Sequence, residues 1–163
     1  MKKIIVFLVI ISIFINMNKV KSVNIPDKSI RIRVIANSNS KIDQNEKIKI
    51  SIEVQNYVQE LLKNTTNIKE ADRIIKNNIN KIDNEIKKYT NNYTLVYGKN
   101  FFPEKRYKGI IYNEGYYDSL VIKLGRGKGK NWWCVLFPPL CLMETEEDVE
   151  YKFYVKEIID KYF

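Results

Sequence analysis

Apolar and polar side chains alternate near residue 30 and then change to a helical spacing. Between residues 30 and 34, isoleucine and valine alternate with arginine, which predicts a strand with one buried face. Ser40, followed three residues later by Asp43, resembles a helix N-cap, and the apolar residues after it recur every three or four positions. The pattern therefore predicts a strand followed by a helix over residues 41–63.

A second helix is predicted directly after the first. Asn67 with Glu70 resembles another N-cap. The apolar residues that follow step by three and four without a miss: Ile68, Ala71, Ile75, Ile79, Ile82, Ile86 and Tyr89. Such a stripe is typical of the buried face of a core helix, and a partner-helix or membrane-surface role is the alternative.

After residue 92 the chain changes to short apolar runs rich in aromatic and β-branched residues. These runs predict strands at residues 93–97, 107–112, 117–124 and 132–137, with turns short enough for antiparallel pairing. Thr145, followed by three acidic residues, predicts the start of a C-terminal helix. The order β-α-α-β-β-β-β-α predicts an α+β domain with helices packed on a mostly antiparallel sheet.

The N-terminus has the layout of a secretory signal peptide. Two lysines precede a mostly apolar run, Ile4 to Ile15, which covers about 18 Å as a helix and is short for a bilayer core of roughly 30 Å. We expect cleavage near Ser22; retention as an N-terminal anchor and burial in the mature fold are the alternatives. The predicted organisation is a leader at residues 1–22 and one domain at residues 23–163.

Length and charge restrict the function classes. A chain of 163 residues predicts one domain, and its net charge of +9 includes four lysines of the leader. A mildly basic exported domain attracts anionic lipid headgroups, wall polymers or an acidic receptor, whereas nucleic acid is not expected outside the cytoplasm. The sequence contains no histidine, which excludes Ser-His-Asp and Cys-His nucleophiles and HExxH zinc sites. We expect no cofactor and no small-molecule substrate.

A glycine-rich basic segment, Gly125 to Asn131, invites comparison with a phosphate-binding loop. A Walker A loop needs a hydroxyl residue after its lysine and a helix behind it, whereas here Asn131 stands at that position and a strand follows. The segment therefore predicts either a flexible hairpin with a solvated basic surface or a contact for an anionic partner. Its candidate contact residues are Arg126, Lys128 and Lys130.

The tryptophan pair that follows is the least ordinary feature of the chain. In a strand, Trp132 and Trp133 point to opposite faces, so that if one fills the core the other faces solvent or a partner. Coverage of both rings within the domain is the alternative. An exposed tryptophan beside a Pro-Pro turn is a plausible interface anchor, which adds Trp132, Trp133, Phe137, Pro138 and Pro139 to the candidate partner-binding residues.

Cys134 and Cys141 are the only cysteines, and a disulfide between them can persist in an exported protein. The bond requires the chain to reverse at Pro138-Pro139, because seven extended steps span about 23 Å. Two buried thiols are the alternative, and a metal site is not expected. Glu104, Glu114 and Asp118 are the carboxylates that a wall-polymer hydrolase would use.

Two sequence blocks resemble a known family. The first is Ile32 to Ser40, continued by Asp43-Gln44 and Lys47, and the second is Gly125 to Cys141, which reads GRGKGKNWWCVLFPPLC. Both are similar to signatures of the stage II sporulation protein R family, and the resemblance covers about residues 30–142. Departures are modest: Asn39 replaces an acidic residue, and Glu104-Lys105 follows Phe-Pro in place of a small hydroxylated residue.

The resemblance implies a non-catalytic signalling protein of endospore formation. Such a protein is made in the forespore and exported into the space between forespore and mother cell. There it triggers a membrane-embedded aspartic protease, the sigma-E processing peptidase, which matures pro-sigma-E in the mother cell. A wall-polymer binding or hydrolysing module is the alternative function.

Overall fold

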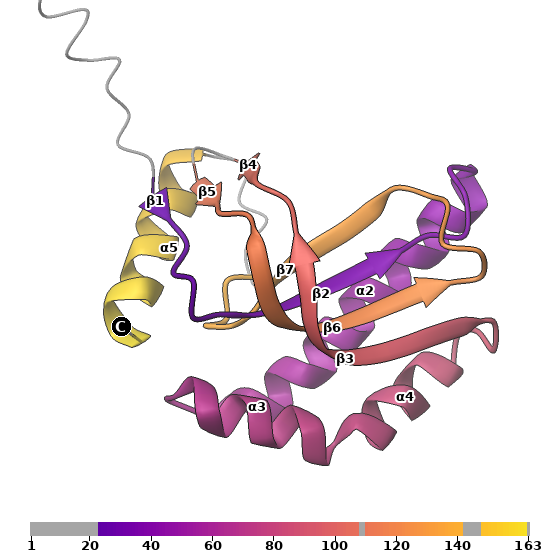
Figure 1. Cartoon of the computed structure of the whole chain (residues 1–163), viewed down its shortest axis with the longest axis horizontal. Helices are drawn as coiled ribbons and strands as arrows, with labels where there is room; N and C mark the ends of the chain where they lie inside the picture. Colours follow the sequence, from indigo (N-terminus) through magenta and orange to yellow (C-terminus); the bar gives the residue numbers. More distant parts are fainter. Residues whose placement is uncertain (1–22, 108–109, 142–147, 163) are drawn as a thin grey trace, which may run out of the picture.

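The computed structural model of the chain describes residues 23–107, 110–141 and 148–162. Its main sheet has four strands in the order β3-β6-β2-β7 (Figure 1). These strands are β2 (Ile30–Ile35), β3 (Tyr93–Phe102), β6 (Gly115–Leu124) and β7 (Asn131–Phe137). β2 lies parallel to β6 and antiparallel to β7, and β3 lies antiparallel to β6.

Helices cover one face of this sheet. They are α2 (Lys41–Leu62), α3 (Ile68–Asn77) and α4 (Ile79–Lys87). Apolar side chains of α2, α3 and α4 meet the inward residues of β2 and β6 in the main core, where Ile32, Val54 and Leu120 have no exposed surface. Both predicted caps are confirmed: the Ser40 side chain accepts a hydrogen bond from the Asp43 amide, and the Asn67 side chain accepts one from the Glu70 amide.

The predicted second helix is divided at Asn78, between α3 and α4. The Asn78 side chain donates a hydrogen bond to the Ile74 carbonyl at 2.9 Å, which competes with regular helical pairing. The apolar stripe continues across the break, because α3 and α4 lie under the same sheet (Figure 1). Hydrophobic spacing alone therefore does not reveal the division.

A smaller sheet and a helix pack at one end of the molecule. The sheet has the order β1-β5-β4, from β1 (Val23–Asn24), β4 (Lys105–Tyr107) and β5 (Ile110–Tyr112). The helix is α5 (Asp148–Tyr162). Ile25, Ile110, Leu140 and Val155 form a second core there with Val135 of β7. Residues on the face of the main sheet away from α2, α3 and α4 are thus partly covered.

The α+β class, its element order and its mostly antiparallel pairing are confirmed. The predicted leader and the predicted start of the C-terminal helix at Thr145 lie outside the described residues. Within the described ranges, none of the helices combines the length and the apolar character that a bilayer-spanning segment needs.

Candidate partner-binding site

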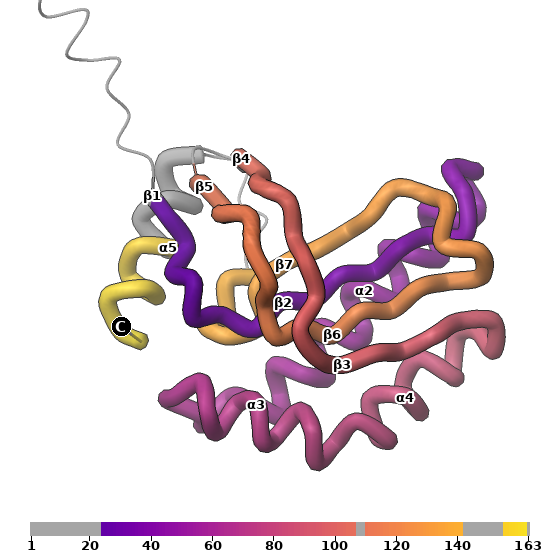
Figure 2. Tube along the Cα trace, viewed as in Figure 1, coloured from indigo at the N-terminus to yellow at the C-terminus, as the bar shows by residue number. Residues whose placement is uncertain are grey.

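The basic hairpin between β6 and β7 docks on the loop between β2 and α2 (Figure 2). Its amides at Lys128 and Gly129 donate to the carbonyls of Asn37 and Ala36, at 3.1 and 2.8 Å. Two further hairpin amides donate to the loop's asparagine side chains: Arg126 to Asn37 Oδ1 at 3.1 Å and Lys130 to Asn39 Oδ1 at 2.8 Å. The two sequence blocks, about 90 residues apart, therefore form one hydrogen-bonded unit. The amides that a phosphate loop would offer to an anion are already bonded.

Two glycines permit this docking. A Cβ at Gly129 would overlap the Ser38 carbonyl oxygen and the Ala36 Cβ, so the hairpin backbone approaches the loop too closely for any side chain. Gly125 has φ of +50°, a conformation that favours glycine, and a Cβ there would lie 2.6 Å from Asn37 Oδ1. Glycines at these two positions are therefore needed for the close contact between the hairpin and the β2–α2 loop.

Asp43 holds the β2–α2 loop from the first turn of α2. Its carboxylate accepts hydrogen bonds from the Ser38 hydroxyl and from Asn37 Nδ2, the latter at 3.0 Å. These bonds, with the Ser38 hydroxyl contributing most, hold the pKa of the Asp43 carboxyl below its usual range. A charged Asp43 therefore orients the Asn37 side chain, which meets the hairpin, and holds the neighbouring Ser38.

Lys47 links α2 to the end of the hairpin. Its ammonium donates to Gln44 Oε1 at 2.7 Å and to the Lys130 carbonyl at 3.3 Å. Burial, and then the positive charge of Lys130, lower the pKa of Lys47. Lys47 is therefore part of the internal framework of the site.

The predicted cationic contact residues lie on the surface of this unit. Arg126, Lys128 and Lys130 are exposed, and within the described part of the chain none of them forms an ion pair. Because their backbones are fixed by the loop, the three charges project from a defined position.

The two tryptophans point to opposite faces, as the strand pattern requires, and both are half-buried. Trp132 packs against the main core, whereas Trp133 packs against the second core. Trp133 also lies among aromatic rings, with centroid distances of 5.3 Å to Phe102 and 6.0 Å to Tyr112. Trp133 is therefore the tryptophan on the face away from the helices.

Cations accompany the rings around Trp133. Arg31 has no exposed surface, and its guanidinium carbon lies 3.3 Å from the centroid of the Tyr117 ring. The Arg33 guanidinium carbon lies 4.7 Å from the Phe102 centroid, and Lys105 Nζ lies 5.1 Å from that of Trp133. Burial lowers the pKa of all three cations. This cluster is not evident from the sequence, where its only signal is the pair of arginines in the first strand.

Cys134 and Cys141 form the predicted disulfide, with their Cα atoms 5.7 Å apart. The chain reverses at Pro138-Pro139, as that bond requires, and the Phe137–Pro138 peptide bond is cis. The Leu140 amide donates back to the Val135 carbonyl at 3.3 Å. A tied, compact turn therefore follows β7.

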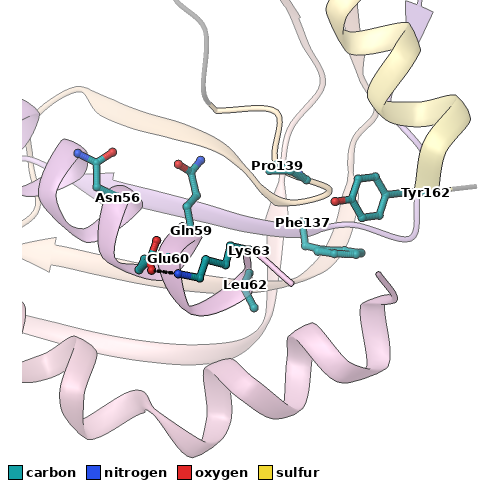
Figure 3. A pocket seen from close by; sticks show the side chains of 8 residues that line it. All are labelled: Asn56, Gln59, Glu60, Leu62, Lys63, Phe137, Pro139 and Tyr162. Carbon is teal, nitrogen blue, oxygen red and sulfur yellow. Dashed lines mark hydrogen bonds and ion pairs between the residues drawn. The ribbon is translucent and has the colours of Figure 1, made fainter. Parts of the chain in front are cut away.

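The turn buries two of the candidate contact residues and leaves the third accessible. Phe137 is 2% exposed and Pro138 is buried, so both support the turn from inside, whereas Pro139 is half-buried. Pro139 and Phe137 border a pocket of about 400 Å³ between the turn, α2 and α5 (Figure 3). The other lining residues are Asn56, Gln59, Glu60, Leu62, Lys63 and Tyr162.

The candidate residues do not form one patch. The hairpin precedes β7 and the Pro-Pro turn follows it, so a strand of seven residues, about 20 Å long, separates them. Of the candidate carboxylates, Glu104 pairs with Arg106 at 3.0 Å and Asp118 with Lys99 at 2.9 Å, and Glu114 is exposed. The site is thus an extended face with a basic end and an apolar end.

Fold and site together define a disulfide-bonded α+β domain with a docked basic hairpin. The profile of the stage II sporulation protein R family matches residues 26–147, and the chain belongs to this family. A stage II sporulation protein R of Bacillus subtilis strain 168 is 39% identical over 127 residues, which cover 74% of this chain and 56% of the relative. The chain thus spans about half the length of that relative. No solved structure matches the chain. The family membership gives the protein a role in sporulation.

Proposed function

We propose that this protein is an exported, non-catalytic signal of endospore formation that activates a membrane-embedded aspartic protease. The protease, the sigma-E processing peptidase, then removes the pro-sequence of pro-sigma-E in the mother cell. Family membership supports the role in sporulation, and the resemblance of both sequence blocks supports the signalling step. The signal acts after its export from the forespore into the intermembrane space.

The docking of the two blocks is the observation that carries this proposal. Hydrogen bonds from Gly129 and Lys130 to the β2–α2 loop fix the hairpin, and the Cys134–Cys141 disulfide fixes the Pro139 turn at the other end of β7. A rigid face of this kind loses little conformational entropy when it binds. It is therefore suited to recognition of a protein surface.

Activation requires more than binding. The protein must bind the active arrangement of the protease more tightly than the inactive one, because a ligand of equal affinity for both shifts nothing. Contacts at two separated ends of one strand provide such selectivity, since only one arrangement of the receptor meets both at once. Trp133 and Pro139 supply apolar contacts, and the hairpin supplies charge.

The direction of the hairpin is compatible with a receptor in the opposite membrane. The strand β1, which begins at Val23, lies at the other end of β2 from the hairpin (Figure 1). A retained leader would therefore place the hairpin away from the membrane of export. A cleaved leader would leave the domain free to diffuse across the intermembrane space.

Coexpression tests the proposal. The chain with residues 1–22, the candidate protease and pro-sigma-E are produced together in a non-sporulating host, and pro-sequence removal is followed by gel mobility. We expect processing that requires the chain and is lost when residues 1–22 are deleted. Absence of processing with all three proteins present and export verified would contradict the proposal, and retention on insoluble peptidoglycan would then favour the wall-polymer alternative.

A Trp133→Ala variant tests whether Trp133 contacts the receptor or only supports the fold. We expect this variant, once shown to fold and to be exported, to trigger less processing than the parent chain. Normal processing by the folded variant would remove Trp133 from the receptor contact.

A further inference from the structure

The pocket beside the Pro139 turn contains a buried hydrogen-bond donor without a partner. This donor is Nε2 of Gln59, and within the described residues no group accepts a hydrogen bond from it. The Gln59 side chain extends from α2 on the side of the Pro139 turn and lines the pocket there (Figure 3). A donor that loses water without gaining an acceptor lowers stability, and an acceptor brought by a ligand would satisfy it.

The neighbouring glutamine shows what a structural amide does at this place. Gln55 precedes Gln59 by one turn of α2, and its Nε2 donates to the Cys141 carbonyl at 3.1 Å. Residues four apart lie on the same side of a helix, yet Gln59 finds no such carbonyl in the part of the chain that the structure describes. Gln55 therefore already links α2 to the end of the turn, and Gln59 does not add to that link.

The lining of the pocket combines apolar surface with balanced charge. Leu62 and Phe137 are 6% and 2% exposed and form part of the apolar lining. The Tyr162 ring meets Phe137 edge-on, with 5.1 Å between the ring centroids, so that α5 contributes an aromatic wall. Glu60 and Lys63, the charged residues of the lining, form an ion pair with each other. The pocket therefore offers an unmet donor and apolar contact without net charge.

From the unpaired amide and this lining we infer that the pocket binds a neutral peptide segment of the protein partner. A backbone carbonyl of the segment accepts the hydrogen bond from Gln59, and an apolar side chain beside it packs against Leu62 and Phe137. The volume of about 400 Å³ lies in the lower part of the range of ligand sites, which suits a few residues of an extended chain. The inference rests on the proposed function only for the identity of the partner.

A peptide suits this lining better than a wall sugar. A sugar ring carries several hydroxyl groups, each of which needs a hydrogen-bond partner when it leaves water. Leu62 and Phe137 offer none, and Glu60 is engaged with Lys63. The pocket also adjoins Pro139 at the apolar end of the extended face, so a segment bound there is continuous with a receptor contact along β7.

The side-chain amide of Gln59 reports on binding directly. The isotope-labelled protein is titrated with the capped tripeptide N-acetyl-alanyl-leucyl-alanyl amide while its NMR spectrum is recorded. N-acetylglucosamine, a unit of wall polymers, is titrated in parallel. The Gln59 side-chain signals are assigned by their loss in a Gln59→Leu variant, and Asn84→Leu, which removes an exposed amide from α4, is the matched control.

We expect the tripeptide to move the Gln59 side-chain signals, with a dissociation constant of about 1 mM. Gln59→Leu should bind the tripeptide about fivefold more weakly, as followed at the backbone amide of Leu62, because the hydrogen bond to the carbonyl is lost. Asn84→Leu should bind like the parent.

Thermal unfolding separates a binding role of Gln59 from a structural one. Gln59→Leu removes an amide without an acceptor, so the midpoint of unfolding should not fall, whereas Gln55→Leu breaks the bond to Cys141 and should lower it. In the coexpression assay Gln59→Leu should nevertheless trigger about fivefold less processing than Asn84→Leu. A glutamine with a merely structural role would not combine full stability with reduced processing. If Gln59→Leu does not fold, Gln59→Met gives the same comparison.

Three results would overturn the inference. The first is the absence of any change at the Gln59 side chain when the tripeptide is added. The second is a change that N-acetylglucosamine causes and the tripeptide does not, which would favour the wall-polymer alternative. The third is a clear loss of stability in both Gln59→Leu and Gln59→Met, which would show that this amide is bonded within the domain.

The proposed function and the inference can fail separately. If the coexpressed proteins show no processing while the tripeptide still binds, the proposed function fails and the peptide pocket stands. If the parent chain triggers processing and the folded Gln59→Leu variant triggers it equally well, the assignment of the pocket to this partner is overturned.

Discussion

The guanidinium of Arg31 stacks on the ring of Tyr117, with 3.3 Å between the guanidinium carbon and the ring centroid. Arg31 points away from the main core, opposite to Ile30 and Ile32, and within the described residues its nitrogens have no hydrogen-bond acceptor. Stacking on Tyr117 and Phe102 is therefore its main compensation for lost hydration. Such an arrangement costs stability.

Arg31→Met should raise the free energy of unfolding. Methionine fills a similar volume without a buried charge, and replacements of this kind are often neutral or stabilising. After the lost cation–π contact is subtracted, we expect the free energy of unfolding to rise by about 1 kcal/mol. Chemical denaturation measures the change, and Arg73→Met on the surface of α3 is the control. A clear loss of stability in Arg31→Met would show that the favourable contacts of Arg31 within the domain outweigh the cost of removing its charge from water.

Gly129→Ala should destabilise the domain by about 2 kcal/mol, because the new methyl group meets backbone that cannot move aside easily. The Ser38 carbonyl is the obstacle, so the hairpin must lift from the β2–α2 loop. Lys128→Ala, one residue earlier and exposed, keeps its backbone amide and should stay within about 0.5 kcal/mol of the parent. Equal stabilities of the two variants would show that the hairpin is not held against the loop.

Cys134→Ser combined with Cys141→Ser should lower stability by about 2.5 kcal/mol, on the loop-closure estimate for a short ring. The loss should appear in thermal unfolding under oxidising conditions. The parent chain treated with a reductant should unfold like the double variant. Unchanged unfolding of the double variant would argue against a stabilising disulfide.

Several local features could be predicted from the sequence because their causes are local. Ser40 and Asn67 cap helices with their own side chains, and the two cysteines are separated by a turn that the prolines favour. The burial of Arg31 could not be predicted. It depends on the rings of Phe102, Tyr117 and Trp133, which come from three other strands far away in the sequence. The strand pattern placed Arg31 correctly on the face away from the helices but did not show what covers it.

The docking of the hairpin was equally hidden. It depends on hydrogen bonds between Asn37 and the hairpin backbone, and neither hydrophobic spacing nor charge reports such bonds. The glycine spacing was the only trace, and it predicted either a flexible hairpin or a contact for an anionic partner. The extended form of the candidate site could not be predicted either. The hairpin and the prolines are close in sequence, but β7, which carries the tryptophans, separates them in space.

Stability should depend on Asp43 in the acid range. Its pKa is lowered in the folded protein, chiefly by the Ser38 hydroxyl, so its contribution is present above the pKa of the unfolded chain and is lost as pH falls through the folded value. Asp43→Asn should therefore flatten the decline of unfolding free energy between about pH 5 and pH 2. Glu46→Gln, which removes another carboxylate from α2, is the comparison. An Asp43→Asn curve parallel to that of the parent would show that the Asp43 network adds no pH dependence.

Removal of the hairpin charges should impair signalling without unfolding the domain. Arg126, Lys128 and Lys130 contribute backbone amides to the docking and leave their side chains exposed, so changing all three to glutamine preserves the hydrogen bonds to Ala36, Asn37 and Asn39. The lost charge slows association with an acidic receptor surface, and processing in the coexpression assay should fall several-fold. Lys69, Arg73 and Lys81 changed to glutamine are the control, since they remove the same charge from α3 and α4. If both triple variants lose processing to the same extent, net charge, and not the fixed position of the hairpin, governs association with the receptor.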